Sequence, residues 1–160
     1  MLFRTINPEE TEQAISIEQI CFPPNEACLP RSMRDRISAA KELFLVAVDE
    51  NTGQIAGFLN GIATNEESFR DEFFTDITLH NPDGKNIMLL GLDVLPEFRG
   101  KGLAKEIVRQ YAERERVRDK LILTCLEEKV PMYEHMGFSD NGMANSSWGG
   151  EEWHEMEMLL

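Results

Sequence analysis

Two glycines and two basic residues stand together in the middle of the chain, in Arg99-Gly100-Lys101-Gly102-Leu103-Ala104. An apolar run precedes this segment and a stretch with helical periodicity follows it, so we expect it to connect a buried strand to a helix. Free N–H groups at a helix N-terminus carry a partial charge of roughly +0.5, and Arg99 and Lys101 add full charges beside them. The pattern indicates a phosphate-binding turn. The alternative is an ordinary turn with solvated basic side chains.

A second chemically suggestive segment follows at 130–138, with the sequence Val-Pro-Met-Tyr-Glu-His-Met-Gly-Phe. Pro131 favours a helix start and Gly137 favours a left-handed helix end, so the segment predicts a short helix over Val130 to Met136. The phenol of Tyr133 can serve as a general acid. It can also simply pack against the sheet.

Together these segments resemble the GNAT acetyltransferases. Arg99, Gly102 and Ala104 match the family's Arg/Gln-x-x-Gly-x-Gly/Ala loop, and Pro131, Tyr133 and the Gly137-Phe138 pair match its Pro-x-Tyr-x-x-x-Gly-Phe segment. The resemblance covers about residues 86–138. It implies an acetyl-coenzyme A-dependent N-acetyltransferase: a mixed α/β fold with a mostly antiparallel twisted sheet, splayed at the cofactor cleft, and helices on both faces. One domain is expected over 1–160.

The resemblance also implies a cofactor site. The loop side of that site consists of Arg99, Gly100, Lys101, Gly102, Leu103, Ala104 and Lys105. Backbone N–H groups around Leu92, Asp93 and Val94 are expected to face the thioester and pantetheine. Tyr133 is then expected to protonate the departing thiolate.

Residues Leu123 to Phe138 are most similar to the arylalkylamine N-acetyltransferase branch, with Cys125 followed by acidic residues. The vertebrate members of that branch place two histidines on the central strand. Met88 and Leu90 occupy those positions here, and neither side chain can titrate. The vertebrate proton path therefore does not carry over.

The acceptor side is outlined less sharply. An alkylamine has a pKa of about 10.4 and is protonated at neutral pH, so a base must take its proton. Glu26 is the first candidate, because the loop that holds it borders the acceptor pocket in the family. Asp93, Glu151 and Glu152 are further candidates for meeting the amine, and Glu26 can equally be a solvated loop residue. The expected pocket residues are apolar: Phe22, Pro23, Met33 and Trp148, with Trp153 predicted to pack in the core or a closing hairpin.

The elements that must position these residues follow from periodicity and turn signals. Asn7, Pro8 and Glu10 predict a helix start, and Ser32 can cap a second helix. The expected order is β-α-α-β-β-β-α-β-α-β-β. Its segments are strands at 2–6, 43–48, 54–63, 86–95, 120–126, near Phe138 and at 153–160, and helices at 7–21, 32–40, 102–116 and 130–136, with one short helix possible within 66–82.

Composition limits the partners. Sixteen basic and 29 acidic residues give a net charge of −13, which disfavours a nucleic-acid binder and suits a cationic amine. We expect no membrane span or signal peptide, a cytoplasmic location, three reduced cysteines and no metal site. The chain can be a monomer or a homodimer.

Two alternatives to a small-amine acetyltransferase stay open at this point. The acceptor can be a protein N-terminus, since ribosomal-protein acetylating relatives also carry a tyrosine in the matching segment. A non-catalytic acetyl-coenzyme A-binding regulatory module also explains the glycine loop, but it does not need Tyr133.

Overall fold

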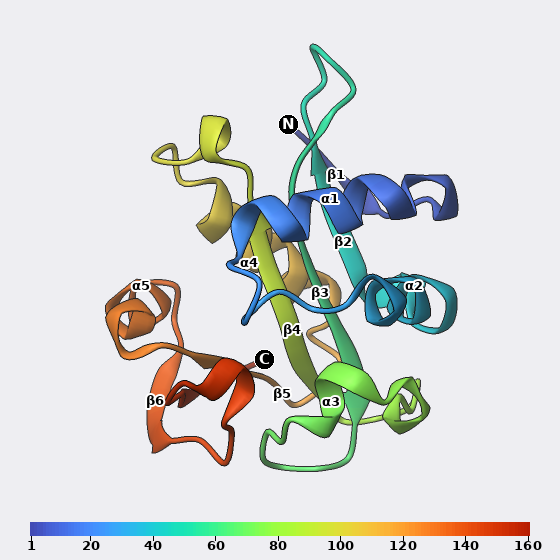
Figure 1. Ribbon diagram of the computed structural model, residues 1–160. Helices are drawn as coiled ribbons and strands as arrows, with labels where there is room; N and C mark the ends of the chain where they lie inside the picture. Colours follow the sequence, from blue (N-terminus) through green and yellow to red (C-terminus); the bar gives the residue numbers. More distant parts are fainter.

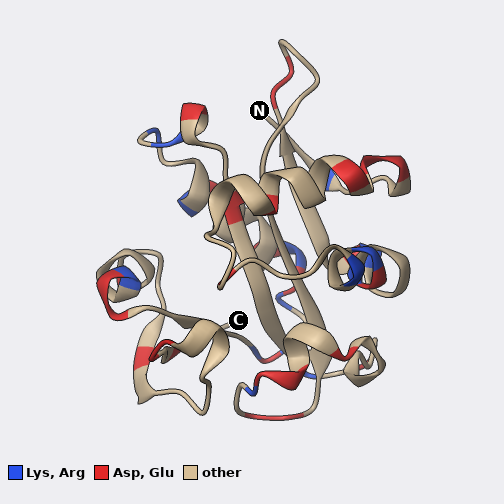
Figure 2. Cartoon of the chain, viewed as in Figure 1, with Lys and Arg blue, Asp and Glu red and all other residues tan.

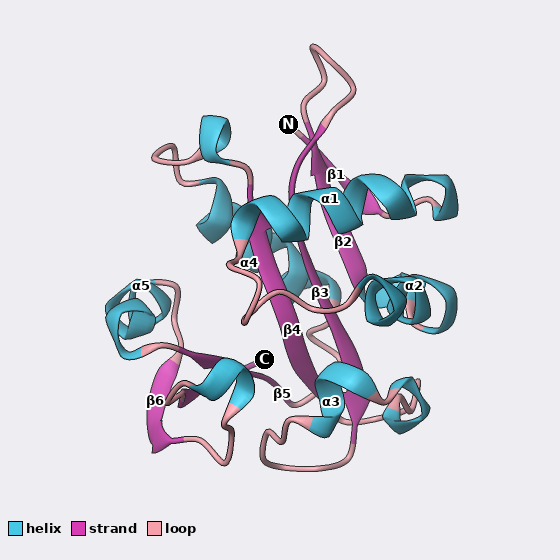
Figure 3. Cartoon of the chain, in the orientation of Figure 1, coloured by secondary structure: helices cyan, strands magenta, loops and turns pink.

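A computed structural model describes all 160 residues, and its strands form one seven-stranded sheet in the order β1-β2-β3-β4-β5-β7-β6 (Figures 1 and 3). All neighbouring strands are antiparallel except β4 and β5. The strands are β1 (Leu2–Thr5), β2 (Phe44–Val48), β3 (Ile55–Thr64), β4 (Asn86–Val94), β5 (Lys120–Cys125), β6 (Ser139–Met143) and β7 (His154–Leu159). The helices are α1 (Thr11–Cys21), α2 (Pro30–Ala39), α3 (Glu72–Thr75), α4 (Leu103–Arg114) and α5 (Val130–His135).

Side-chain alternation along β2 divides the core between the two faces of the sheet. Leu45 and Ala47 pack with α4, whose buried stripe is the one predicted: Leu103, Ile107, Val108 and Tyr111. Phe44 and Val46 belong to the cluster that contains residues of α1 and α2. Helices therefore cover both faces, and the order of strands and helices agrees with the prediction.

The functional feature of this sheet is the separation of β4 from β5. The two parallel strands pair only from Asn86↔Lys120 to Met88↔Ile122. Beyond Met88, β4 continues to Val94 with β3 as its only strand partner, while β5 continues beside β7. The part of β4 from residue 89 to residue 94 thus has an edge without a neighbouring strand, and Figure 1 shows α5 and β6 set apart from it.

A β-bulge lies in this part of β4. Asn60 pairs with Gly91 and Gly61 pairs with Leu89, so Leu90 is an extra residue opposite β3. Bulges redirect side chains and backbone groups, and they occur often beside active sites.

The predicted start of the first helix, with Asn7 as its cap, is confirmed, whereas the predicted start of the second helix is wrong. The first helix begins as a 3-10 turn, Pro8–Glu10, before α1, and the Asn7 N–H donates to Glu10 Oε1 over 2.8 Å. The Ser32 cap is wrong: α2 begins at Pro30, and Ser32 lies buried inside its first turn. Proline at the first helical position needs no N–H partner, so the cap is Leu29, three residues before the predicted one.

None of the helices combines the length and apolar character that crossing a bilayer would take. The three cysteines are all free thiols.

Candidate active site

The glycine loop leads from the end of β4 into α4, as its sequence predicts. Gly100 and Gly102 have φ angles of +79° and +80°, and a Cβ built on either would have no atom within 4 Å. Arg99 Nε donates to the carbonyl of Val94 over 2.8 Å, which holds the loop against the strand. The first N–H groups of α4 have no partner within the helix. This arrangement fits the pyrophosphate of coenzyme A, and Figure 2 shows basic residues on the loop of an otherwise acidic chain.

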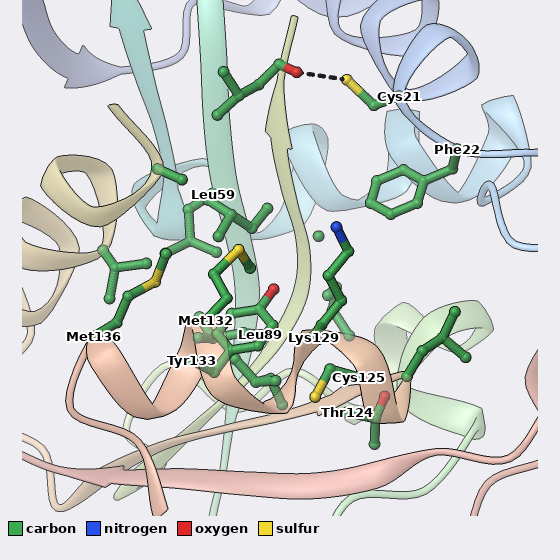
Figure 4. A pocket seen from close by; sticks show the side chains of 18 of the residues that line it. Cys21, Phe22, Leu59, Leu89, Thr124, Cys125, Lys129, Met132, Tyr133 and Met136 are labelled. Carbon is green, nitrogen blue, oxygen red and sulfur yellow. Dashed lines mark hydrogen bonds between the residues drawn. The ribbon is translucent and has the colours of Figure 1, made fainter. Parts of the chain in front are cut away.

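A cavity of about 650 Å³ opens where β4 and β5 separate. It is mostly apolar, and its walls come from the α1–α2 loop, β4, α4, β5, α5 and the C-terminal loop (Figure 4). The predicted site residues that line it are Phe22, Pro23, Glu26, Leu92, Val94, Arg99, Gly100, Gly102, Leu103, Ala104, Lys105, Tyr133 and Trp148.

Among the residues expected to bind the cofactor or to form the acceptor pocket, three do not line the cavity. Met33 is fully buried in the cluster beneath α1 and α2, because it belongs to the apolar stripe of α2. Lys101 is exposed on the loop, between the two glycines that do reach the cavity. The side chain of Asp93 is buried within the protein, beside Glu18.

Tyr133 lies on α5, and its side chain reaches the cavity together with those of Met132 and Met136 (Figure 4). Its ring packs edge-on against Phe138, with the ring centroids 5.6 Å apart. Burial is the main cause that raises the pKa of the Tyr133 phenol, and the neighbouring Cys125 and Asp93 contribute less. The phenol is therefore a protonated group near the β4 edge.

Glu26 faces a second carboxyl, that of Glu151. Burial raises the pKa of Glu26 to about 7, and the hydrogen bond and charge of Glu151 and the charge of Glu128 contribute after it. A carboxyl with this pKa can accept a proton near neutral pH. Glu152, the adjacent candidate, is exposed and does not line the cavity.

The α1–α2 loop is fastened to the C-terminal loop. Trp148 Nε1 donates to the backbone carbonyl of Glu26 over 2.9 Å, and Asn25 Nδ2 donates to the carbonyl of Gly149 over 3.2 Å. Gly149 approaches so closely that a Cβ there would lie 2.6 Å from the carbonyl oxygen of Asn25. These contacts hold Glu26 at the cavity.

Aromatic rings form the wall of the cavity beside the C-terminal loop. The ring of Trp148 packs against that of Phe74, with centroids 4.7 Å apart, and Trp153 Nε1 donates to the carbonyl of Trp148. Trp153 thus lines the cavity rather than filling the core, and Phe74 is a wall residue that the sequence did not indicate.

Glu18 and Asp93 form a second carboxyl pair that sequence reasoning missed. Glu18 lies on α1, is 4% exposed and lines the cavity, whereas Asp93 is fully buried on β4. Burial raises the pKa of Asp93 well above its usual range, and the charge of Glu18 adds to this. The sequence does contain a signal for this pair, because each is a charged residue within an otherwise apolar helix face or strand.

No curated protein matches the sequence significantly. Solved structures match along nearly the whole chain, and three of them illustrate the range. The loading GNATL domain of CurA from Lyngbya majuscula gives a TM-score of 0.85 at 13% identity, covering 99% of this chain and 96% of that one. The GphF GNAT-like decarboxylase in complex with isobutyryl-CoA gives 0.84 at 15%, covering 99% of both chains. The phosphinothricin acetyltransferase from Sinorhizobium meliloti, in complex with AcCoA, gives 0.69 at 15%, covering 99% and 88%.

These likenesses confirm the predicted fold. They extend over diverse GNAT proteins, and none of the three is an arylalkylamine N-acetyltransferase. The sequence itself matches the acetyltransferase (GNAT) family over residues 11–138. The chain therefore belongs to the acetyltransferase (GNAT) family, which confirms the predicted acyltransferase class and its coenzyme A cofactor.

Proposed function

We propose that this protein transfers an acetyl group from acetyl-coenzyme A directly to the primary amine of a small molecule. One observation carries the proposal. A single cavity contains the glycine loop before α4, the protonated phenol of Tyr133 and the carboxyl of Glu26, whose pKa is about 7. These are the parts that an amine acetylation needs.

The roles follow from the chemistry of each group. The acceptor enters as an ammonium and must lose a proton before nitrogen can attack, and Glu26 is the group poised to accept that proton. Backbone N–H groups along the open edge of β4 face the thioester carbonyl. As the new C–N bond forms and the C–S bond breaks, Tyr133 donates its proton to the departing thiolate. The nitrogen then releases its second proton, which restores the phenol of Tyr133, and Glu26 passes the first proton to water.

Transfer through an acyl-cysteine is disfavoured by the thiols of the cavity. Burial raises the pKa of Cys125 to about 12, and burial also raises the pKa of Cys21. Both thiols are therefore protonated at neutral pH and are poor nucleophiles.

The aromatic and acidic acceptor side suits an amine that carries an apolar or aromatic body. An arylalkylamine satisfies this description and a polyamine satisfies only its charge. A peptide N-terminus is a third acceptor with the same reacting group.

The test is release of free thiol from acetyl-coenzyme A against arylalkylamines, polyamines, aminoglycosides and short peptides. Turnover should appear with one class and should fall about 10²- to 10⁴-fold in Tyr133→Phe, with coenzyme A affinity unchanged. Coenzyme A binding without turnover on any acceptor would favour a regulatory module. Loss of affinity in Tyr133→Phe would instead give this residue a structural role.

A second candidate is decarboxylation of a carboxylated acyl-coenzyme A, as the name of the GphF structure suggests. It is favoured by Lys129, which extends into the cavity without forming an ion pair there and can hold a carboxylate (Figure 4). Carbon dioxide release from malonyl-coenzyme A in the absence of any amine would establish this activity, and Lys129→Met should abolish it.

A further inference from the structure

The carboxyl of Glu18 is buried, ionisable and only partly satisfied. Its Oε2 accepts a hydrogen bond from the Cys28 N–H over 3.1 Å, while Oε1 has no partner in the protein. The side chain is 4% exposed, yet it lines the cavity. A buried polar atom without a partner is unfavourable, and more so if it is charged, so its ligand is expected to come from the cavity.

Asp93 determines the charge of this site. It is fully buried, and neither of its oxygens receives a hydrogen bond from a protein donor. Its raised pKa keeps it protonated, which leaves an O–H available to donate to Glu18. The pair therefore offers a proton donor in Asp93 and an acceptor without a protein partner in Glu18 Oε1.

Neither carboxyl forms an ion pair, and the nearby buried Arg36 donates instead to Asn60 Oδ1 at 3.3 Å and to the Phe74 carbonyl at 2.9 Å. Four basic or acidic side chains besides Glu18 line the cavity, and none of them forms a hydrogen bond or an ion pair with Glu18 or Asp93: Glu26, Arg99, Lys105 and Lys129. The thiols of Cys21, Cys28 and Cys125 and the phenol of Tyr133 are the other titratable groups nearby, and the contact of Cys28 with Glu18 is through its backbone N–H.

Gly91 opens the pair towards the β4 edge. A Cβ at this position would lie 3.2 Å from Asp93 Oδ1, 3.2 Å from Asn60 Nδ2 and 3.5 Å from Glu18 Oε1. Gly91 lines the cavity beside the bulge of β4. A side chain here would fill the space in front of the carboxyls, so glycine keeps that space free for a ligand.

We propose that Glu18, supported by Asp93, is the subsite that binds the ammonium group of the acceptor, next to Gly91 on β4. The inference rests on the proposed function and specifies its acceptor as a cationic primary amine. Glu18 binds and orients the ammonium, and Glu26 remains the group that takes its proton. An uncharged alcohol or amide of the same shape is discriminated against, because it leaves the Glu18 charge unpaired.

The test is calorimetric binding of 2-phenylethylamine and of uncharged 2-phenylethanol to the protein saturated with coenzyme A. The wild type should prefer the amine, and Glu18→Gln should lose about 10- to 100-fold in amine affinity with little change for the alcohol. The glutamine oxygen can still accept from the Cys28 N–H, so the fold is expected to persist, as an unchanged melting temperature would verify. Asp93→Asn should retain amine affinity within about threefold, because its amide N–H replaces the O–H donor.

Wild-type protein that shows no preference for the amine, or binds neither compound, would overturn the subsite. Equal losses for amine and alcohol in Glu18→Gln would also overturn it, since they would indicate a structural role. These outcomes are separate from those for the proposed function, because binding requires no turnover: a protein that prefers the amine without acetylating it would refute the reaction and retain the subsite.

Discussion

The indole Nε1–H of Trp148 donates a hydrogen bond of 2.9 Å to the backbone carbonyl of Glu26, which lies 122 residues earlier in the chain. The contact fastens the loop with the proposed base to the loop that forms the aromatic wall of the cavity. The position of Glu26 therefore depends on a residue that does not itself need to react.

Trp148→Phe should loosen this loop. The ring contact with Phe74 can persist, but the hydrogen bond, worth about 1 kcal/mol, is lost. We expect the KM for the acceptor to rise about three- to tenfold and the KM for acetyl-coenzyme A to stay constant in steady-state assays. A parallel rise in both constants would mean that Trp148 supports the whole protein rather than the acceptor side.

Gly102→Ala should weaken coenzyme A binding. Its φ of +80° is strained for alanine by about 1–2 kcal/mol, and relief of that strain would move the start of α4. We expect at least a tenfold loss of coenzyme A affinity by calorimetry. Gly53→Ala is the matched control, because Gly53 has a φ of +75° in the β2–β3 turn and does not line the cavity. Both variants should lose similar stability, and only Gly102→Ala should lose affinity.

The pH dependence of turnover should report Glu26. Since the base acts when deprotonated and its pKa is about 7, kcat/KM should rise with pH up to roughly this value and then level off. Glu26→Gln should lower the plateau of kcat/KM about 10²- to 10⁴-fold and remove the rising limb of the pH profile. Glu151→Gln should keep activity and move the limb to lower pH, because a neutral neighbour no longer raises the pKa of Glu26. A limb that stays in place in both variants would assign it to another group.

Stability should respond to the same carboxyl. Because the folded-state pKa of Glu26 lies above its ordinary value, the folded protein binds its proton more tightly. Stability from this group is thus present below about pH 4.5 and is lost as pH rises through about 7. Between pH 5 and pH 8 the melting temperature of wild type should fall relative to that of Glu26→Gln.

Glu10→Gln provides the control of opposite sign. Its hydrogen bonds with Arg4 hold the pKa of Glu10 below its usual value, so this group stabilises the protein above that value. The variant should be less stable than wild type at neutral pH, and the difference should shrink on acidification. The same trend for both variants would show that Glu26 does not hold the raised pKa.

Local patterns predicted most of the fold and the glycine turn that leads into α4. A few consecutive residues are enough to predict each of three features: the apolar stripe of α4, the apolar run of β4 and the turn with Gly100 and Gly102. The start of α2 was misplaced because Ser32 and Pro30 both favour a helix start, and the chain uses the proline.

The acceptor side was harder to predict because long-range packing creates it. Glu18 shares a helix face with Ala14 and Cys21, and only the fold shows that this face borders a cavity. Phe74 becomes a wall residue through its contact with Trp148, far along the chain. Met33 is apolar, as a pocket residue would be, but it lies on the face of α2 that packs into the core.

The fastening of residues 25 and 26 to residues 148 and 149 has a consequence for how the protein is made. At about 5–20 residues per second, translation reaches Trp148 on the order of 10 s after Glu26. During that interval the glycine loop and β4 can already exist, whereas the aromatic wall cannot. A nascent chain can therefore form the glycine loop before it can form the aromatic wall that is fastened to residues 25 and 26.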